Sequence, residues 1–285
     1  MLAAPFNAGR AAVLPTILEG DQYVVASGII TITYQFALLA GFASGGVLVA
    51  GIDPGGALLV DAATFLASAA LVRFELADRP AAGVDGPEQE SWLARIGGGA
   101  GLVWHDRRLR LLVALAGLAG FYVVVEGLAV PYADALGGGA GTVGLLLAAS
   151  PAGAVIGILV LNRVPPARRQ RLLVPMAVGS CLPLVGCLAM PGLTVTVLLW
   201  LVSGAFSSYQ MVANAEFVRA VPDDRRGQAF GLAVTALLVS QGVGVLATGI
   251  AAEVVAPATV IAGAGAMGVV VALVLGRAWG RLSVG

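Results

Sequence analysis

The sequence predicts an all-α protein of the polytopic membrane class, a bundle of transmembrane helices, and three observations lead to this prediction. Hydrophobic residues make up 59% of the 285 residues and charged residues only 11%, which is too little charge to solvate a soluble domain of this size. About eight apolar segments each approach the roughly 20 residues that cross a hydrocarbon core. All 16 positive charges are arginines, and they fall only in alternate gaps between those segments.

The order of the segments follows from these apolar runs. We expect membrane helices at residues 29–51, 55–74, 110–133, 141–162, 171–190, 193–216, 228–252 and 256–276. Arginines precede the first segment and follow every second one, whereas the other gaps hold only Asp53, Asp134 and Glu253. Because cytoplasmic loops carry the excess of positive charge, we predict a multi-pass protein of the plasma (cytoplasmic) membrane with both termini in the cytoplasm.

Composition also narrows the classes of function. Glycine is abundant, with 40 residues, which favours helices that pack closely through small residues. Net charge is zero, so nothing indicates a nucleic-acid partner; the expected partners are the lipid bilayer and a small molecule. The chain has one His and lacks metal-ligand spacing, a nucleophile motif and a phosphate loop. We therefore predict no enzymatic activity, no metal site and no cofactor.

An internal repeat predicts how the chain is organised. Residues 7–74 resemble residues 214–276 in layout: Asn7 matches Asn214, and Gln35 matches Gln241 after a one-residue gap. Parallel repeats of this kind form the two halves of many transporters. The later copy ends a six-helix half, so by the same logic the earlier copy ends a half of which two helices are present. We expect an eight-helix remnant of a twelve-helix protein.

Three regions follow from this organisation. Residues 1–74 are the end of an N-terminal half, 75–108 form a cytoplasmic linker, and 109–285 are the C-terminal six-helix half. Within the linker, apolar residues recur at helical spacing from Trp92 to Trp104, which indicates an amphipathic helix on the inner membrane surface. This helix is either a brace that couples the halves or an ordinary connection with some membrane affinity.

Five stretches carry a resemblance to a known family. In chain order they are PFNAGRAAVLPTIL (5–18), LLVDAATFLASAAL (58–71), GGAGLVWHDRRLRLL (98–112), LAVPYA (128–133) and GLLLAASPAGAVIG (144–157). Together they resemble the major facilitator superfamily, in its twelve-helix drug-efflux branch that includes macrolide and siderophore exporters. The resemblance covers the whole chain as helices five to twelve of the family. It implies a major facilitator fold and a secondary active antiporter that exports a drug or another small amphipathic compound in exchange for protons, as in multidrug resistance.

Two family motifs have counterparts here. Gly41, Gly45 and Gly46 of this chain resemble the glycines of the family's antiporter signature, whose proline is replaced here by another residue. We expect close helix packing through Gly41 and Gly45. Asp61 stands where the family commonly has Asp, and we expect it to contact the helix at 29–51. Five residues of this chain resemble the family's cytoplasmic signature, with Asn in place of the usual Asp: Gly157, Asn162, Arg163, Arg168 and Arg169.

Candidate site residues are the polar groups within the apolar segments. Glu126, one turn from Tyr122, is the best candidate to interact with substrate or protons, because a carboxylate in the bilayer is costly to retain. The alternative is a structural hydrogen-bonding residue near the outer rim. By resemblance, three further helices border a central cavity, and their polar residues either line a substrate path or bond the helices together: Ser203, Ser207, Gln210 and Asn214, then Thr235, Gln241 and Thr248, then Thr31, Tyr34 and Gln35.

The sequence leaves two kinds of function open. The first is the proton-coupled efflux transporter. The second is a non-transporting membrane remnant that acts as a partner subunit of a full-length transporter, because the six-helix half keeps its loops and its arginine pattern.

Overall fold

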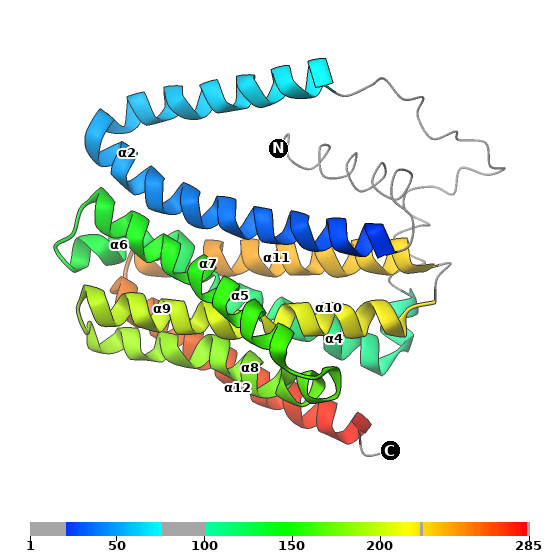
Figure 1. Ribbon diagram of the computed structural model, residues 1–285. Helices are drawn as coiled ribbons and strands as arrows, with labels where there is room; N and C mark the ends of the chain where they lie inside the picture. Colours follow the sequence, from blue (N-terminus) through cyan, green and yellow to red (C-terminus); the bar gives the residue numbers. More distant parts are fainter. Residues whose placement is uncertain (1–20, 76–100, 223–224, 284–285) are drawn as a thin grey trace.

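The computed structural model describes residues 21–75, 101–222 and 225–283, and every regular element in these ranges is helical (Figure 1). Seven of the helices are long and apolar enough to cross a membrane, and a shorter apolar helix covers Phe36–Ile52. The predicted class, a helical membrane bundle, is therefore confirmed. The predicted segments all have helical counterparts in the same order.

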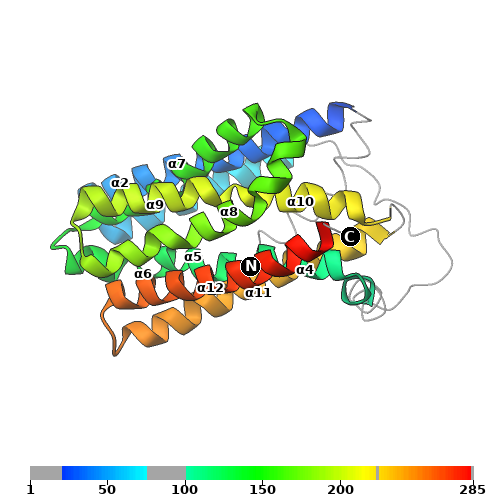
Figure 2. The ribbon, with the colours of Figure 1, turned by 90° about the horizontal axis from the view of Figure 1, so that it is seen from below.

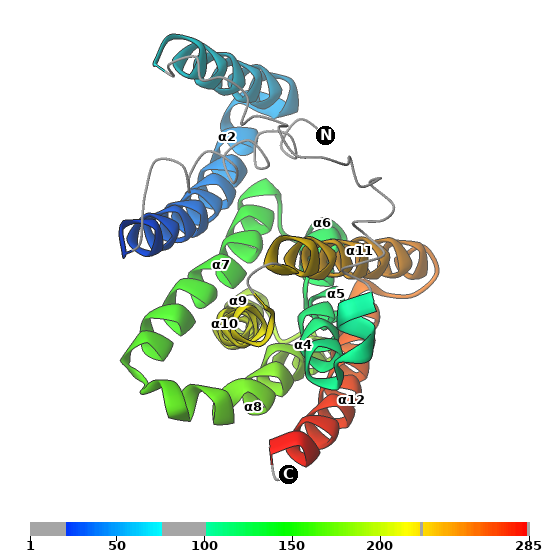
Figure 3. The same cartoon turned by 90° about the vertical axis from the view of Figure 1, so that its right-hand side faces the viewer.

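The first helix, α2 (Asp21–Glu75), bends back on itself and forms two arms (Figure 1). The bend falls where the sequence has Asp53, Pro54, Gly55 and Gly56, and Pro and Gly are the usual causes of sharp helix kinks. The first arm packs against α7 (Ala140–Arg163), whereas the second arm, Gly55–Phe74, has no buried residue. The second arm diverges from the remainder of the bundle (Figures 1 and 3).

The next membrane crossing is interrupted twice. It consists of α4 (Arg107–Gly117), the short α5 (Ala119–Tyr122) and α6 (Val124–Ala135). Asp106 caps the start of α4, because its side chain accepts hydrogen bonds from the backbone N–H groups of Arg108 and Leu109. Of the predicted amphipathic helix, only 101–105 lies within the described residues; it is helical there, and Trp104 is 73% exposed.

The remaining crossings alternate in direction. After α7, the chain returns through α8 (Pro166–Val185) and the 3-10 turn η1 (Gly186–Ala189), then through α9 (Leu193–Ser207) and α10 (Tyr209–Ala220). The last two helices are α11 (Arg226–Ala252) and α12 (Pro257–Ser283). As a result, α4 and α11 begin, and α7, α10 and α12 end, at the same end of the bundle, which we call the arginine end (right in Figure 1, facing the viewer in Figure 3).

Among the residues that the structure describes, those of the buried core lie within 101–283. Its largest fully buried side chains include Trp200, Tyr132 and Tyr209, and the rings of Trp200 and Tyr132 are 6.0 Å apart between centroids. Glycines bring several helix pairs into backbone contact. A Cβ at Gly153 would collide with the Leu201 carbonyl of α9. In the view from below, α12 and α11 lie on one side of the bundle and α2 and α7 on the other (Figure 2).

Candidate functional site

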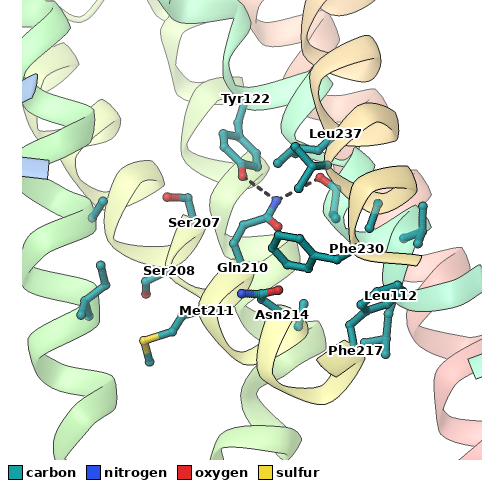
Figure 4. A pocket seen from close by; sticks show the side chains of 17 residues that line it. Leu112, Tyr122, Ser207, Ser208, Gln210, Met211, Asn214, Phe217, Phe230 and Leu237 are labelled. Atoms are coloured by element: carbon teal, nitrogen blue, oxygen red, sulfur yellow. Dashed lines mark hydrogen bonds between the residues drawn. The ribbon is translucent and has the colours of Figure 1, made fainter. Parts of the chain in front are cut away.

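A cavity of about 450 Å³ lies between α4, α5, α7, the end of α9, α10 and α11 (Figure 4). Its wall is mainly apolar, and every one of these helices contributes to it. Four of the residues predicted from the sequence line it, namely Tyr122, Ser207, Gln210 and Asn214. The other lining residues include Leu112, Ala116, Ile158, Met211, Phe217, Phe230 and Leu237. An apolar cavity with a few convergent polar groups is the usual form of a small-molecule site.

Gln210 is the centre of the polar wall. Its Nε2 donates to the Ala116 carbonyl over 2.9 Å and to the Tyr122 hydroxyl over 3.0 Å, and it lies 3.3 Å from the Tyr209 hydroxyl. Tyr209 in turn donates to the Leu115 carbonyl over 2.7 Å. The Tyr122 and Tyr209 hydroxyls also interact with each other, so of this group the Gln210 carbonyl oxygen is left for another partner among the described residues. The wall therefore offers a hydrogen-bond acceptor beside the two hydroxyls.

These polar residues lie at the helix interruptions. Tyr122 ends α5, and Val123 separates it from α6; Ser208 separates α9 from α10, directly before Tyr209 and Gln210. The carbonyls of Leu115 and Ala116 belong to the last turn of α4, where both accept from the Leu118 backbone N–H. Side chains of α10 add a second donor to each carbonyl. Interrupted membrane helices occur in transporters where backbone and side chains line a cavity.

Three polar residues of the α9–α10 crossing differ in their surroundings. Ser207 lines the cavity, although its hydroxyl donates to the Gly204 carbonyl of its own helix over 2.7 Å. Asn214 is exposed in the cavity wall. Ser203, predicted on the same face, is buried, and its hydroxyl donates to the Ser180 carbonyl over 2.5 Å. Ser203 and Ser207 both belong to α9, so their surroundings differ although they are one helical turn apart.

Glu126 does not line this cavity. It lies in the first turn of α6 on the exposed side, and its carboxylate has no hydrogen bond to any described residue. Val130 and Asp134 follow on the same face at steps of four, and both line a second cavity, of about 440 Å³, between α2, α6 and α7. Glu126 and Tyr122 are one helical turn apart in the sequence, but they do not line the same cavity.

The other predicted polar residues lie away from the cavity. The hydroxyls of Thr235 and Thr248 donate to carbonyls of their own helix, and Gln241 is partly exposed on α11 without lining the cavity. Tyr34 is 62% exposed on α2. The side chains of Thr31 and Gln35 lie outside the described residues.

The antiporter-like glycines meet α7 at a position that the sequence did not predict. A Cβ at Gly41 or Gly45 would have no atom within 4 Å, so the expected packing through these two residues is wrong. Gly46 is the contact instead, because a Cβ there would lie 2.8 Å from the Gly144 Cα. Asp61 is exposed on the second arm of α2, and the bend carries it away from the first arm that it was expected to contact.

Residues of the cytoplasmic signature meet at the turn between α7 and α8. Arg169 donates to the carbonyls of Val164 and Asn162 over 2.7 and 3.2 Å, and Arg163 donates to the Leu159 carbonyl over 3.3 Å. Arg168 is exposed in the same turn. Gly157 lies earlier on α7, where a Cβ would collide with the Ala205 carbonyl of α9, so the two helix backbones are in close contact at this glycine.

Sequence reasoning missed the most connected carboxylate. Glu216 of α10 is only 2% exposed and forms ion pairs with Arg108 over 2.7 Å and with Arg219 over 2.9 Å. Gln170 of α8 donates to the same carboxylate over 2.7 Å, and the Arg108 guanidinium lies 6.0 Å above the Trp279 ring of α12. Because the sequence predicts that the helix ends at 216, this residue was not counted among the membrane carboxylates. A Glu three positions before an Arg was the available signal.

The described residues contain no group of three or more His, Cys, Asp or Glu side chains placed to hold a metal ion. Comparison of the chain with protein-family models, with curated proteins and with solved structures finds no match in any of the three.

Proposed function

We propose that this protein is a secondary active transporter of the major facilitator type, which binds a small amphipathic compound in the cavity around Gln210 and exports it in exchange for protons. The observation that supports this most is the cavity itself. Four polar residues predicted from the sequence line it, three helix interruptions surround it, and its remaining wall is apolar. A compound with one hydrogen-bonding group and an apolar body matches this wall.

The experiment that tests the binding role compares two glutamines. Gln210→Leu removes the central amide of the cavity, and Gln241→Leu removes an amide of the same bundle that does not line it. We expect Gln210→Leu to lower the affinity for a transported dye about tenfold, since the hydrogen bond to the ligand is lost. Gln241→Leu should leave dye affinity unchanged. Equal effects of the two substitutions on dye uptake by inverted vesicles would contradict the proposal.

Proton coupling is assigned to Glu126. Its carboxylate lies on a membrane-crossing helix without a hydrogen-bond partner among the described residues, and such carboxylates are retained in membranes for function. Glu126→Gln should abolish export driven by a pH gradient while dye binding and the amount of protein in the membrane stay unchanged. Unchanged gradient-driven export would make Glu126 a structural residue.

A second candidate function is that of a non-transporting membrane partner subunit. The second arm of α2 supports it, because none of its described residues is buried against another helix of this chain. Purification from membranes discriminates the two functions. A chain that purifies alone and still lowers dye accumulation in cells excludes the partner role.

A further inference from the structure

The exposed residues of α12 form one continuous stripe. They recur at steps of three or four, which is the period of an α-helix, so they share one side of it. In order they are Gly263, Ala266, Met267, Val270, Leu273, Val274, Arg277, Gly280 and Arg281. The other sides of α12 pack mainly against α8, with further contacts to η1, α6, α4, α5 and α11, and Gly263 and Met267 of the stripe border a cavity shared with α5 and α11. The stripe is therefore the side of α12 that faces the membrane.

The chemistry of the stripe changes along its length. Met267, Val270 and Val274 are 59%, 60% and 56% exposed and form its apolar part. Arg277 and Arg281 follow one turn apart at the arginine end, and in the described part of the chain neither has a carboxylate partner. The stripe thus joins an apolar surface to two uncompensated positive charges.

The orientation of these two arginines is fixed by the residue between them. Trp279 lies two positions from each, on the opposite side of α12, and its ring lies under the Arg108 guanidinium at 6.0 Å. That cation–π contact holds Trp279 against α4, so Arg277 and Arg281 remain on the membrane-facing side. Arg108 is itself paired with Glu216, and neither exposed arginine of α12 shares that carboxylate.

The apolar part has the length of one lipid leaflet. From Arg277 to Met267 the helix rises by about 15 Å, at about 1.5 Å per residue. The hydrocarbon core of a bilayer is about 30 Å thick, so a single leaflet covers about half of it. A phospholipid whose phosphate lies at Arg277 would therefore reach Met267 with its acyl chains.

We propose that this side of α12 binds an anionic phospholipid of the leaflet at the arginine end. Its phosphate lies between Arg277 and Arg281, and one acyl chain lies along Val274, Val270 and Met267. Basic residues where membrane helices leave the bilayer recognise anionic headgroups, and the apolar stripe adds the acyl contact that a free anion lacks. The proposal depends on the insertion of α12 in a bilayer, and it does not depend on transport.

The test is a titration of the full-length chain, purified in a neutral detergent, with phosphatidylglycerol. Retained lipid is measured by native mass spectrometry. We expect Arg277→Gln/Arg281→Gln to bind about 30-fold more weakly than the unmodified chain, and Arg281→Gln alone about 5-fold more weakly. Should the double variant not purify as a folded protein, the single variant decides. The charge-preserving pair Arg277→Lys/Arg281→Lys should retain most of the affinity.

Two controls make the test specific. Arg163→Gln removes an exposed arginine at the end of α7, which follows the exposed apolar residues Leu159 and Val160. Unlike the arginines of α12, Arg163 has no second arginine beside it on its helix face, and its guanidinium already donates to the Leu159 carbonyl. It should bind phosphatidylglycerol as the unmodified chain does, and so should Gln210→Leu, whose transport is impaired. Phosphatidylcholine and inorganic phosphate should both bind at least about tenfold more weakly than phosphatidylglycerol. Equal binding by the double glutamine variant, or full binding by inorganic phosphate alone, would overturn the proposal.

Discussion

Residues 101–283 and α2 are built from the same kinds of residue but differ in how these are packed. The first region contains all of the described residues that form the buried core, and its helices are joined by hydrogen bonds and by the ion pairs of Glu216. In α2, no described side chain is buried, and only the first arm packs against the rest of the bundle. Apolar composition alone therefore does not distinguish a helix packed in protein from one that faces lipid.

The difference shows what stabilises a membrane bundle. Lipid tails are as apolar as leucine, so burial of apolar area contributes little between helices in a bilayer. Close backbone contact and satisfied polar groups remain, and both are concentrated in 101–283. Equivalent substitutions in the two regions should then have unequal effects, and three matched pairs test this from the largest effect to the smallest.

The largest difference is expected for Gly→Ala. At Gly153 the new methyl group collides with the Leu201 carbonyl, so α7 and α9 must separate, and we expect a loss of about 3 kcal/mol in the free energy of unfolding. At Gly41 the methyl group meets open space, and the better helix propensity of Ala leaves stability unchanged or raised by up to about 1 kcal/mol. Titration with SDS in mixed micelles measures both values. Equal losses would mean that α2 is packed as tightly as α7.

The second pair replaces a carboxylate by an amide. Glu216→Gln removes both ion pairs, and because the amide NH2 cannot accept a hydrogen bond, either Arg108 or Arg219 also loses its hydrogen bond to residue 216. We expect a loss of about 2 kcal/mol in the free energy of unfolding, a moderate value because both arginines are about half exposed and regain water. Asp61→Asn should cost nothing measurable, since the Asp61 carboxylate has no hydrogen bond to a described residue. The same SDS titration applies. A clear loss for Asp61→Asn would reveal a partner for the second arm of α2.

The third pair removes a tyrosine hydroxyl. Tyr209→Phe leaves the Leu115 carbonyl without its side-chain donor, and we expect a loss of about 1 kcal/mol. Tyr34→Phe removes a hydroxyl that is exposed and has no hydrogen bond in the described part of the chain, so stability should not change. Thermal unfolding in detergent resolves effects of this size. A loss shared by both variants would argue against a hydrogen bond at Tyr209.

Helix positions could be predicted from the sequence because length, apolar composition and arginine placement act on whole segments. Local features within helices could not. Ser203 bonds the Ser180 carbonyl of α8, whereas Ser207, one turn later on the same helix, lines the cavity. Nothing in the residue types around Ser208 predicts the break between α9 and α10. Three of the four polar residues predicted on this crossing line the cavity.

Contacts between helices were the hardest to predict. The glycine that meets α7 is Gly46, one residue from Gly45, and a single position rotates a helix face by about 100°. The role of Glu216 depends on Arg108, which is distant in sequence, so no local pattern contains the pair. Such pairings depend on tertiary geometry, which single-sequence spacing does not fix.

The interrupted helices around Gln210 have a mechanical consequence. The Gln210 amide bridges α10 to the Ala116 carbonyl of α4 and to Tyr122 of α5, so it fixes the angle at which three short helical segments meet. A ligand group that accepts a hydrogen bond from this amide competes with that bridge. Ligand binding in the cavity and the curvature of the two crossings are therefore thermodynamically coupled. The free energy available to change the curvature equals the free energy of the bridging hydrogen bonds that the ligand displaces.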